Sequence, residues 1–142
     1  MTVTSEATTA WTGTLQEGSG RTELASSGLG TFDVSWPKRT SDEAGGSTSP
    51  EELIAAAHAS CYCMFLSGAL DKNGTPPESI ETTASVTFKP GTGITGSHLN
   101  VNAVVPGIEP EDFERIAQEA KAGCPVSQAL AGIEITLEAT LA

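Results

Sequence analysis

The stretch from Pro50 to Leu70 constrains the fold of this chain more than any other feature. It opens with Ser49, Pro50 and Glu52, which match a helix N-cap, a first helical position and the acid of a capping box. Apolar side chains then occupy nearly every side of a helix of about five turns. Because a surface helix would show a polar face, we expect this helix to be buried on all sides.

Strand patterns flank the helix on both sides in the sequence. Thr-rich or alternating segments between Gly-containing turns predict a three-stranded antiparallel meander over residues 8–36. Residues 37–49 are polar and rich in Gly and Ser, which is typical of an irregular loop. The remaining expected elements are a hairpin over 80–105, helices over 109–130 and a strand over 133–141. The order indicates an α+β chain.

The length of 142 residues predicts a single domain over 1–142. About six strands from one small chain would not cover a helix on all sides, so we expect a second subunit to complete the cover, in a homodimer.

The charge of the chain excludes several classes of partner. The formal net charge is −11, with only 7 Lys and Arg, whereas nucleic acids and anionic membranes require a basic surface. Residues 1–10 lack the pattern of a signal peptide, and polar residues such as His58 and Ser67 interrupt the longest apolar run. We therefore expect a cytoplasmic protein with no nucleic acid and no membrane among its partners.

The three cysteines are too few, and odd in number, for a disulfide scaffold. Cys124 precedes Pro125 at a predicted helix start, where free backbone N–H groups stabilise a thiolate. Cys61 lies in the middle of the long helix and would need a cation instead. Cys63 points about 200° away from Cys61 on that helix, which favours a role in the core.

Arg39, in the polar loop, is the best candidate for the cation, and Glu51 is the best candidate to hold its guanidinium. Glu51 lies about 15 Å from Cys61 along the helix axis, too far for direct contact. Either Arg39 joins the two, or Arg39 and Glu51 come from the opposite subunit.

Two rival sites use the same residues. A metal site of His58, Cys61, Cys63 and Cys124 is disfavoured, because Cys61 and Cys63 diverge on one straight helix. A Cys61–His58 nucleophile for acyl transfer is possible by spacing, but no oxyanion loop or orienting acid is visible. His98 stands alone on a strand and is expected to be structural or exposed. No metal and no cofactor is predicted.

Two longer motifs are far more specific than these single residues. Thr48 to Cys61 reads TSPEELIAAAHASC, and Ala120 to Leu130 reads AKAGCPVSQAL. Both resemble the OsmC/Ohr family, in particular its OsmC branch of osmotically inducible proteins. The similarity covers the whole chain, including Ala10 to Gly13, Val105 to Ile108 and the final strand from Ile133 to Leu137.

The resemblance implies a thiol-dependent hydroperoxide reductase, built as an intertwined homodimer whose curved antiparallel sheets enclose a long central helix from each chain. Cys61 matches the family's peroxidatic cysteine, Cys124 its resolving cysteine and Glu51 its site carboxylate. Arg39 matches the catalytic arginine across a variable loop, and Arg21 is the fallback.

In family terms, Cys61 attacks an organic hydroperoxide, or hydrogen peroxide, and becomes a sulfenic acid, which Cys124 converts to a disulfide. A dithiol reductant, in this family a lipoylated protein or dihydrolipoamide, then restores both thiols. Such a protein would defend the cell against oxidative and osmotic stress. The alternatives are a thiol redox sensor without turnover and a hydrolase that uses Cys61 and His58.

Overall fold

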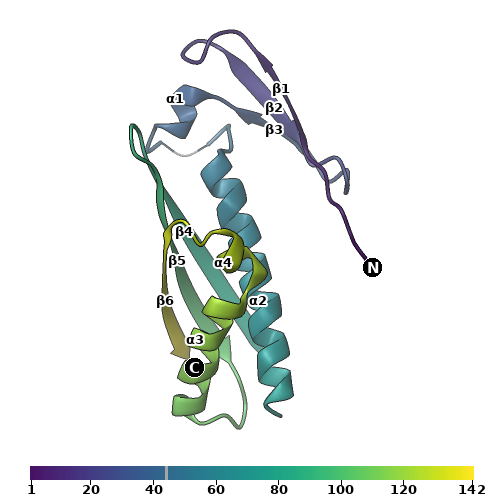
Figure 1. Ribbon diagram of the computed structural model, residues 1–142, viewed down its shortest axis with the longest axis vertical. Helices are drawn as coiled ribbons and strands as arrows, with labels where there is room; N and C mark the ends of the chain where they lie inside the picture. Colours follow the sequence, from purple (N-terminus) through teal and green to yellow (C-terminus); the bar gives the residue numbers. More distant parts are fainter. Residues whose placement is uncertain (44) are drawn as a thin grey trace. The chain divides into compact units, whose positions relative to one another are not determined.

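The computed structural model describes residues 1–43 and 45–142, which divide into two compact units, Met1–Glu52 and Leu53–Ala142. The first unit holds three strands and a short helix, and the second holds three strands and two helices (Figure 1). A long helix, α2 (Pro50–Lys72), begins at the end of the first unit and runs into the second. The predicted α+β class is confirmed, with two sheets and one long helix.

The first unit is the expected antiparallel meander. Its strands β1 (Thr8–Thr12), β2 (Ser19–Glu23) and β3 (Thr31–Val34) pair in sequence order. The next segment differs from the expected irregular loop, because a single-turn helix α1 (Trp36–Arg39) follows β3. Ser35 caps it by accepting a hydrogen bond from the Lys38 N–H at 3.3 Å.

The meander buries very little of its own apolar surface. Thr22 is a rare buried side chain in the sheet, whereas Trp11, Leu15, Leu29 and Phe32 are exposed. A three-stranded sheet needs a covered apolar face to be stable in water. Over residues 1–43 and 45–52, the first unit therefore lacks a hydrophobic core of its own.

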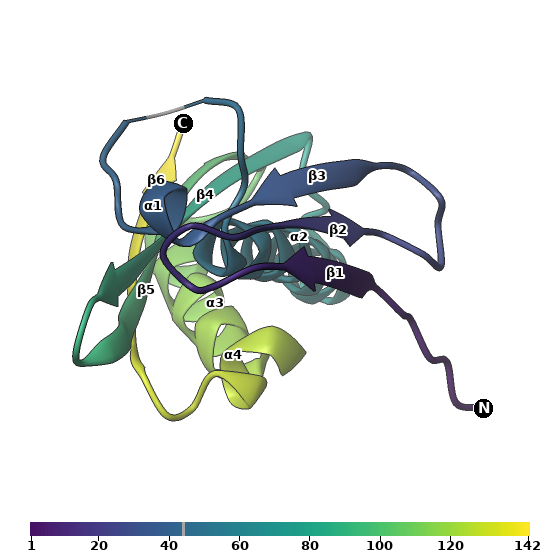
Figure 2. The same cartoon turned by 90° about the horizontal axis from the view of Figure 1, so that it is seen from above.

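The second unit builds its core on one face of a mixed sheet. Strands β4 (Ser79–Lys89) and β5 (Gly93–Val104) form the expected hairpin, and β6 (Glu134–Leu141) pairs with β5 in parallel. The expectation of antiparallel sheets is therefore wrong for this sheet, because a helical crossover returns the chain to run beside β5 in the same direction. Helices α3 (Pro110–Gly123) and α4 (Pro125–Ala129) form the crossover between β5 and β6. Helices α2 and α3 cover the same face of this sheet (Figure 2).

One stripe of α2 enters this core. His58, Tyr62, Leu66 and Leu70 follow one another at intervals of four residues and are all fully buried. The last three pack against a cluster from β5 and α3 that includes Leu99, Val101, Ala103, Phe113 and Ile116.

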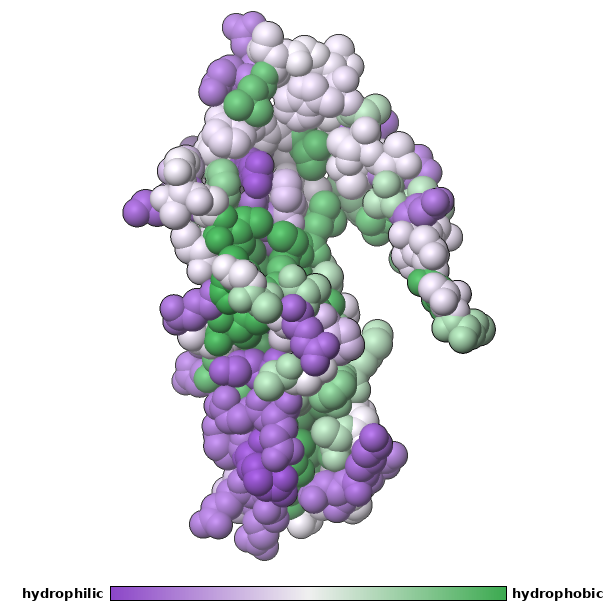
Figure 3. Space-filling view, in the orientation of Figure 1, coloured by the Kyte–Doolittle hydropathy of each residue, from purple (hydrophilic) through white to green (hydrophobic). Residues whose placement is uncertain are grey.

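The other side of α2 stays uncovered, with Ala56, Ala57, Ser60, Met64, Phe65 and Gly68 exposed. Figure 3 shows apolar surface along this part of α2 beside the hydrophilic surface of α3. Within the single chain only one side of α2 is buried, so burial on all sides stays a prediction that depends on a second subunit.

By length and composition alone, α2 could cross a membrane, a property that it shares with the core helices of soluble proteins. In this chain, one stripe of α2 packs against β5 and α3.

Candidate active site

Cys61 and Cys124 are in contact, although they are far apart in the sequence. The Cys124 thiol donates a hydrogen bond to the Cys61 sulfur, and the two sulfurs lie 3.2 Å apart. A disulfide bond measures about 2.05 Å, so the sulfurs need to approach by about 1.2 Å to form one. Cys61 is partly exposed and Cys124 is fully buried. This arrangement can support reversible dithiol–disulfide chemistry.

Gly123 allows Cys124 to come this close to α2. A Cβ atom at position 123 would lie 2.8 Å from carbons of the Phe65 ring, closer than van der Waals contact permits. Without that atom, the end of α3 rests on the α2 side chain, and Cys124 follows directly as the residue that ends α3 and starts α4.

The start of α4 also serves Cys61. The N–H of Val126, in the first turn of α4, donates a hydrogen bond to the Cys61 sulfur. Such N–H groups have no partner within their own helix and favour a negatively charged acceptor. The expectation that no helix terminus serves Cys61 is therefore wrong, because tertiary packing brings it the terminus of another helix.

Burial nevertheless dominates the electrostatics of Cys61. It raises the pKa of the Cys61 thiol above the ordinary value, the neighbouring Cys124 raises this pKa further, and the Val126 N–H opposes both effects. The second unit by itself thus favours the neutral thiol. A reactive thiolate needs additional positive charge.

Arg39 and Glu51 come together within the first unit. Nε and Nη2 of Arg39 donate to Oε1 of Glu51 at 3.0 and 2.7 Å, and Nε also lies 3.3 Å from Oε2. The Glu51 carboxylate is nearly buried, and the guanidinium carbon lies 5.8 Å from the centre of the Trp36 ring. Helix α1 carries Trp36 and Arg39 one turn apart, so both the Trp36 ring and the Glu51 carboxylate hold the Arg39 guanidinium.

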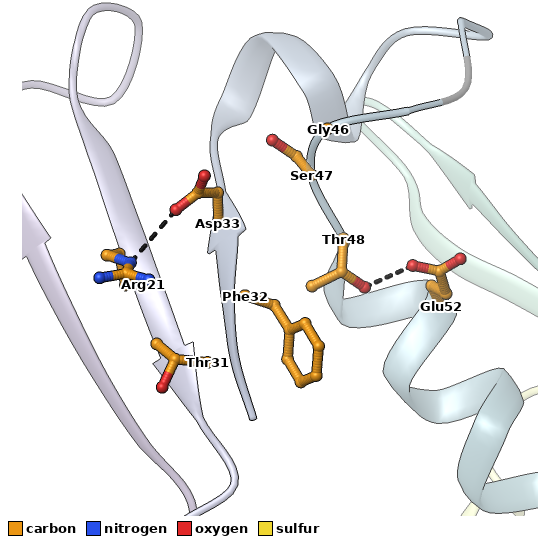
Figure 4. A pocket seen from close by; sticks show the side chains of 8 residues that line it. All are labelled: Arg21, Thr31, Phe32, Asp33, Gly46, Ser47, Thr48 and Glu52. Carbon is orange, nitrogen blue, oxygen red and sulfur yellow. Dashed lines mark hydrogen bonds and ion pairs between the residues drawn. The ribbon is translucent and has the colours of Figure 1, made fainter. Parts of the chain in front are cut away.

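Arg21, the fallback candidate, has a different partner. It pairs with Asp33 at 3.3 Å, and both side chains are more than 60% exposed, at 68% and 63%. The two residues line an open polar hollow of about 340 Å³, with Thr48 and Glu52 on its other side (Figure 4). Such an exposed pair gives little fixed geometry, so Arg39 is the better-held guanidinium.

His58 is not available as a base for Cys61. Its Nδ1 lies 2.7 Å from the Ser97 hydroxyl and its Nε2 lies 2.8 Å from the Ser127 hydroxyl, and all three side chains are buried. Burial lowers the pKa of His58, which favours the neutral ring. The sequence analysis missed this network, although the four-residue interval from His58 to Tyr62, Leu66 and Leu70 already places His58 on the buried stripe.

The other candidate residues lie apart from the sulfur pair. Cys63 donates its thiol hydrogen to the Thr82 hydroxyl at 3.1 Å, and His98 shares a hydrogen bond with Thr136 at 2.6 Å on the sheet. Within residues 1–43 and 45–142, no group of three or more His, Cys, Asp or Glu side chains is arranged to hold a metal ion.

Comparisons with known proteins all find similarity to one family. The sequence profile of the family described as OsmC-like protein matches residues 42–138. The chain is 42% identical to Peroxiredoxin OsmC of Escherichia coli (strain K12), over 97% of this chain and 96% of that protein. It is 32% identical to the organic hydroperoxide resistance protein of Xanthomonas axonopodis pv. citri (strain 306), over 73% of this chain and 75% of that protein.

Solved structures share the fold at lower sequence identity. The crystal structure of an OsmC-like protein from Mycoplasma pneumoniae matches with a TM-score of 0.74 at 12% identity, over 99% of each chain. An organic hydroperoxide resistance protein from Elizabethkingia anophelis matches with a TM-score of 0.71 at 23% identity, over 100% of each chain.

Proposed function

Because this chain belongs to the OsmC family, we propose that it is a cysteine-based peroxidase that reduces organic hydroperoxides, and hydrogen peroxide, to alcohols and water. The observation that carries this proposal is the 3.2 Å contact between the sulfurs of Cys61 and Cys124. The names of its relatives, a peroxiredoxin and an organic hydroperoxide resistance protein, support it.

In the proposed first step, the Cys61 thiolate attacks the terminal oxygen of the peroxide. The S–O bond forms as the O–O bond breaks, sulfur is oxidised by two electrons, and the leaving alkoxide takes a proton to become an alcohol. Cys61 is the partly exposed sulfur of the pair, which suits the residue that meets the substrate.

In the second step, the Cys124 sulfur attacks the Cys61 sulfenic acid. The S–S bond forms as the S–O bond breaks, and hydroxide leaves and is protonated to water. A dithiol, in this family a lipoylated protein or dihydrolipoamide, then reduces the disulfide in two thiol exchanges and is itself oxidised to a disulfide. No cofactor enters this cycle.

Arg39 has two roles in this proposal. Its guanidinium offsets the effect of burial on Cys61, and it stabilises the negative charge that develops on the leaving oxygen. Glu51 orients the guanidinium, since their short ion pair leaves it little freedom to turn. We assign both roles by the match to the family motif and by this pairing.

We further propose that residues 1–142 form one OsmC-like domain within an intertwined homodimer. The exposed side of α2 and the apolar residues that the meander leaves in solvent both need a cover, and a second copy of the chain would supply it. The acidic charge and the core role of α2 are in keeping with a cytoplasmic protein.

The test is turnover of cumene hydroperoxide by the purified protein with dihydrolipoamide as reductant. The wild type should consume peroxide catalytically, and Cys61→Ser should abolish turnover. Cys124→Ser should allow one oxidation, followed by over-oxidation of Cys61. A wild type that forms the disulfide once and then fails to turn over would refute the enzyme and leave a redox sensor.

A mixed dimer tests which chain supplies Arg39 to each sulfur pair. One subunit carries Cys61→Ser and the other carries Arg39→Ala, and each homodimer should be inactive. Turnover by the mixed dimer near half the wild-type rate assigns Cys61 and Arg39 of one site to opposite chains. Turnover at background level assigns them to the same chain.

A further inference from the structure

The buried network around His58 has no part in the chemistry described above. Its imidazole joins three elements, since His58 lies on α2, Ser97 on β5 and Ser127 on α4. Both ring nitrogens have a hydroxyl partner within 2.8 Å, and no ring atom is exposed. A neutral imidazole donates from one nitrogen and accepts at the other, and a serine hydroxyl can complement either. The network is therefore fully satisfied, and it links the elements firmly.

The network lies directly beside the sulfur pair. His58 precedes Cys61 by three residues on α2, so the two side chains are neighbours one turn apart. Ser127 follows Val126, whose N–H reaches the Cys61 sulfur, and lies in the first turn of α4, which starts from Cys124. The His58–Ser127 and Cys61–Cys124 contacts thus join the same two helices, one contact beside the other.

Helix α4 depends on such contacts for its position. It contains five residues, Pro125–Ala129, far fewer than a helix needs to be stable in isolation. Ser127 is the buried residue of this short helix, and its hydroxyl is bonded to the ring on α2. Loss of that bond would leave an unsatisfied buried nitrogen on His58 and a looser helix start.

We propose that His58 is a positioning residue for the redox pair: through Ser127 it holds the start of α4 against α2 and keeps the Cys124 sulfur within reach of Cys61. The proposal rests on the disulfide-forming step proposed above. A well-placed thiol competes effectively with a second peroxide molecule for the sulfenic acid, because its effective concentration at that sulfur is high.

Ser127→Ala removes the link to α4 while it keeps His58 in place. The matched control is Tyr62→Phe, since the buried Tyr62 hydroxyl donates to the Ala117 carbonyl at 2.9 Å and joins α2 to α3 instead of α4. Both variants lose one buried hydrogen bond between helices, so a general loss of stability would affect them alike. His58→Phe, which removes both bonds of the ring, serves as a second variant.

Two readouts by mass spectrometry follow the sulfur pair. The first is the ratio of over-oxidised Cys61 to Cys61–Cys124 disulfide after one exposure to cumene hydroperoxide. The second is the equilibrium between dithiol and disulfide in buffers of reduced and oxidised dithiothreitol, which requires no peroxide.

For Ser127→Ala and His58→Phe, we expect the over-oxidation ratio to rise about tenfold and the equilibrium constant for disulfide formation to fall by about the same factor. Tyr62→Phe should stay within about twofold of the wild type in both. Equal shifts in Ser127→Ala and Tyr62→Phe would overturn the proposal. A wild type without peroxide turnover would refute the proposed function, while the dithiothreitol equilibrium would still decide on the role of His58.

Discussion

Replacement of Glu51 by Gln should show whether the Arg39 guanidinium is fixed by its ion pair or behaves as an ordinary surface charge. The Glu51 side chain is 8% exposed and that of its partner Arg39 is 28% exposed, so the variant removes the paired carboxylate charge from beside a mostly buried cation. Removal of one partner from a buried ion pair costs about 3–5 kcal/mol of unfolding free energy. Because water still reaches part of Arg39, we expect a loss at the lower end, about 3 kcal/mol.

The adjacent Glu52 provides the control. Its carboxylate is exposed and accepts a hydrogen bond from the Thr48 hydroxyl. Glu52→Gln removes the same charge from the same helix start, where a carboxylate contributes about 0.5 kcal/mol through the helix dipole. The difference between the two variants, about 2–3 kcal/mol, therefore isolates the pairing with Arg39.

Urea unfolding at fixed protein concentration measures both costs, and the initial rate with cumene hydroperoxide measures the consequence for catalysis. Glu51→Gln should lower kcat/KM at least about tenfold relative to Glu52→Gln, since the guanidinium loses its fixed orientation. If the two variants have equal stability and equal kcat/KM, the reasoning about Glu51 is wrong.

Three further predictions concern Arg39, His58 and Gly123. Arg39→Ala should shift the pH midpoint of Cys61 alkylation by iodoacetamide upward, because only burial, Cys124 and the Val126 N–H would then act on the thiol; an unchanged midpoint would remove Arg39 as the cation. Lowering the pH from about 6.5 should destabilise the wild type, since the unfolded chain binds a proton at His58 that the folded chain resists. The slope should reach at most about 1.4 kcal/mol per pH unit and should flatten in His58→Gln; equal slopes in urea titrations would contradict it. Gly123→Ala should push α3 away from Phe65 and slow disulfide formation after one peroxide addition, and a wild-type rate would show that the added methyl group is accommodated.

Much of this fold could be predicted from local signals. Ser49 and Pro50 mark the start of α2. The Ser49 hydroxyl accepts a hydrogen bond from the Glu52 N–H at 3.1 Å. The capping box itself is not closed as expected, since the Glu52 carboxylate bonds the Thr48 hydroxyl. The strand alternations and the acidic first turn of α3 were equally readable, because each depends only on neighbours in the sequence.

The site was harder to predict, because its contacts join distant segments. Nothing near His58 in the sequence indicates that Ser97 and Ser127 will form hydrogen bonds with its two ring nitrogens. Likewise, the Val126 N–H is close to the Cys61 sulfur only because the fold packs α4 against α2. Helix α1 was missed because four residues carry no periodic signal, and its cap alone defines it.

In the proposed cycle, the unequal exposure of Cys61 and Cys124 would determine the direction in which the disulfide is reduced. Cys124 is fully buried, whereas Cys61 is partly open to solvent. Once the disulfide has formed, an incoming thiolate reaches the Cys61 sulfur first, so the mixed disulfide should form there and Cys124 should depart as the leaving thiol. Cys61 would thus react with both the hydroperoxide and the reducing thiol, so the two molecules could not occupy the site at the same time.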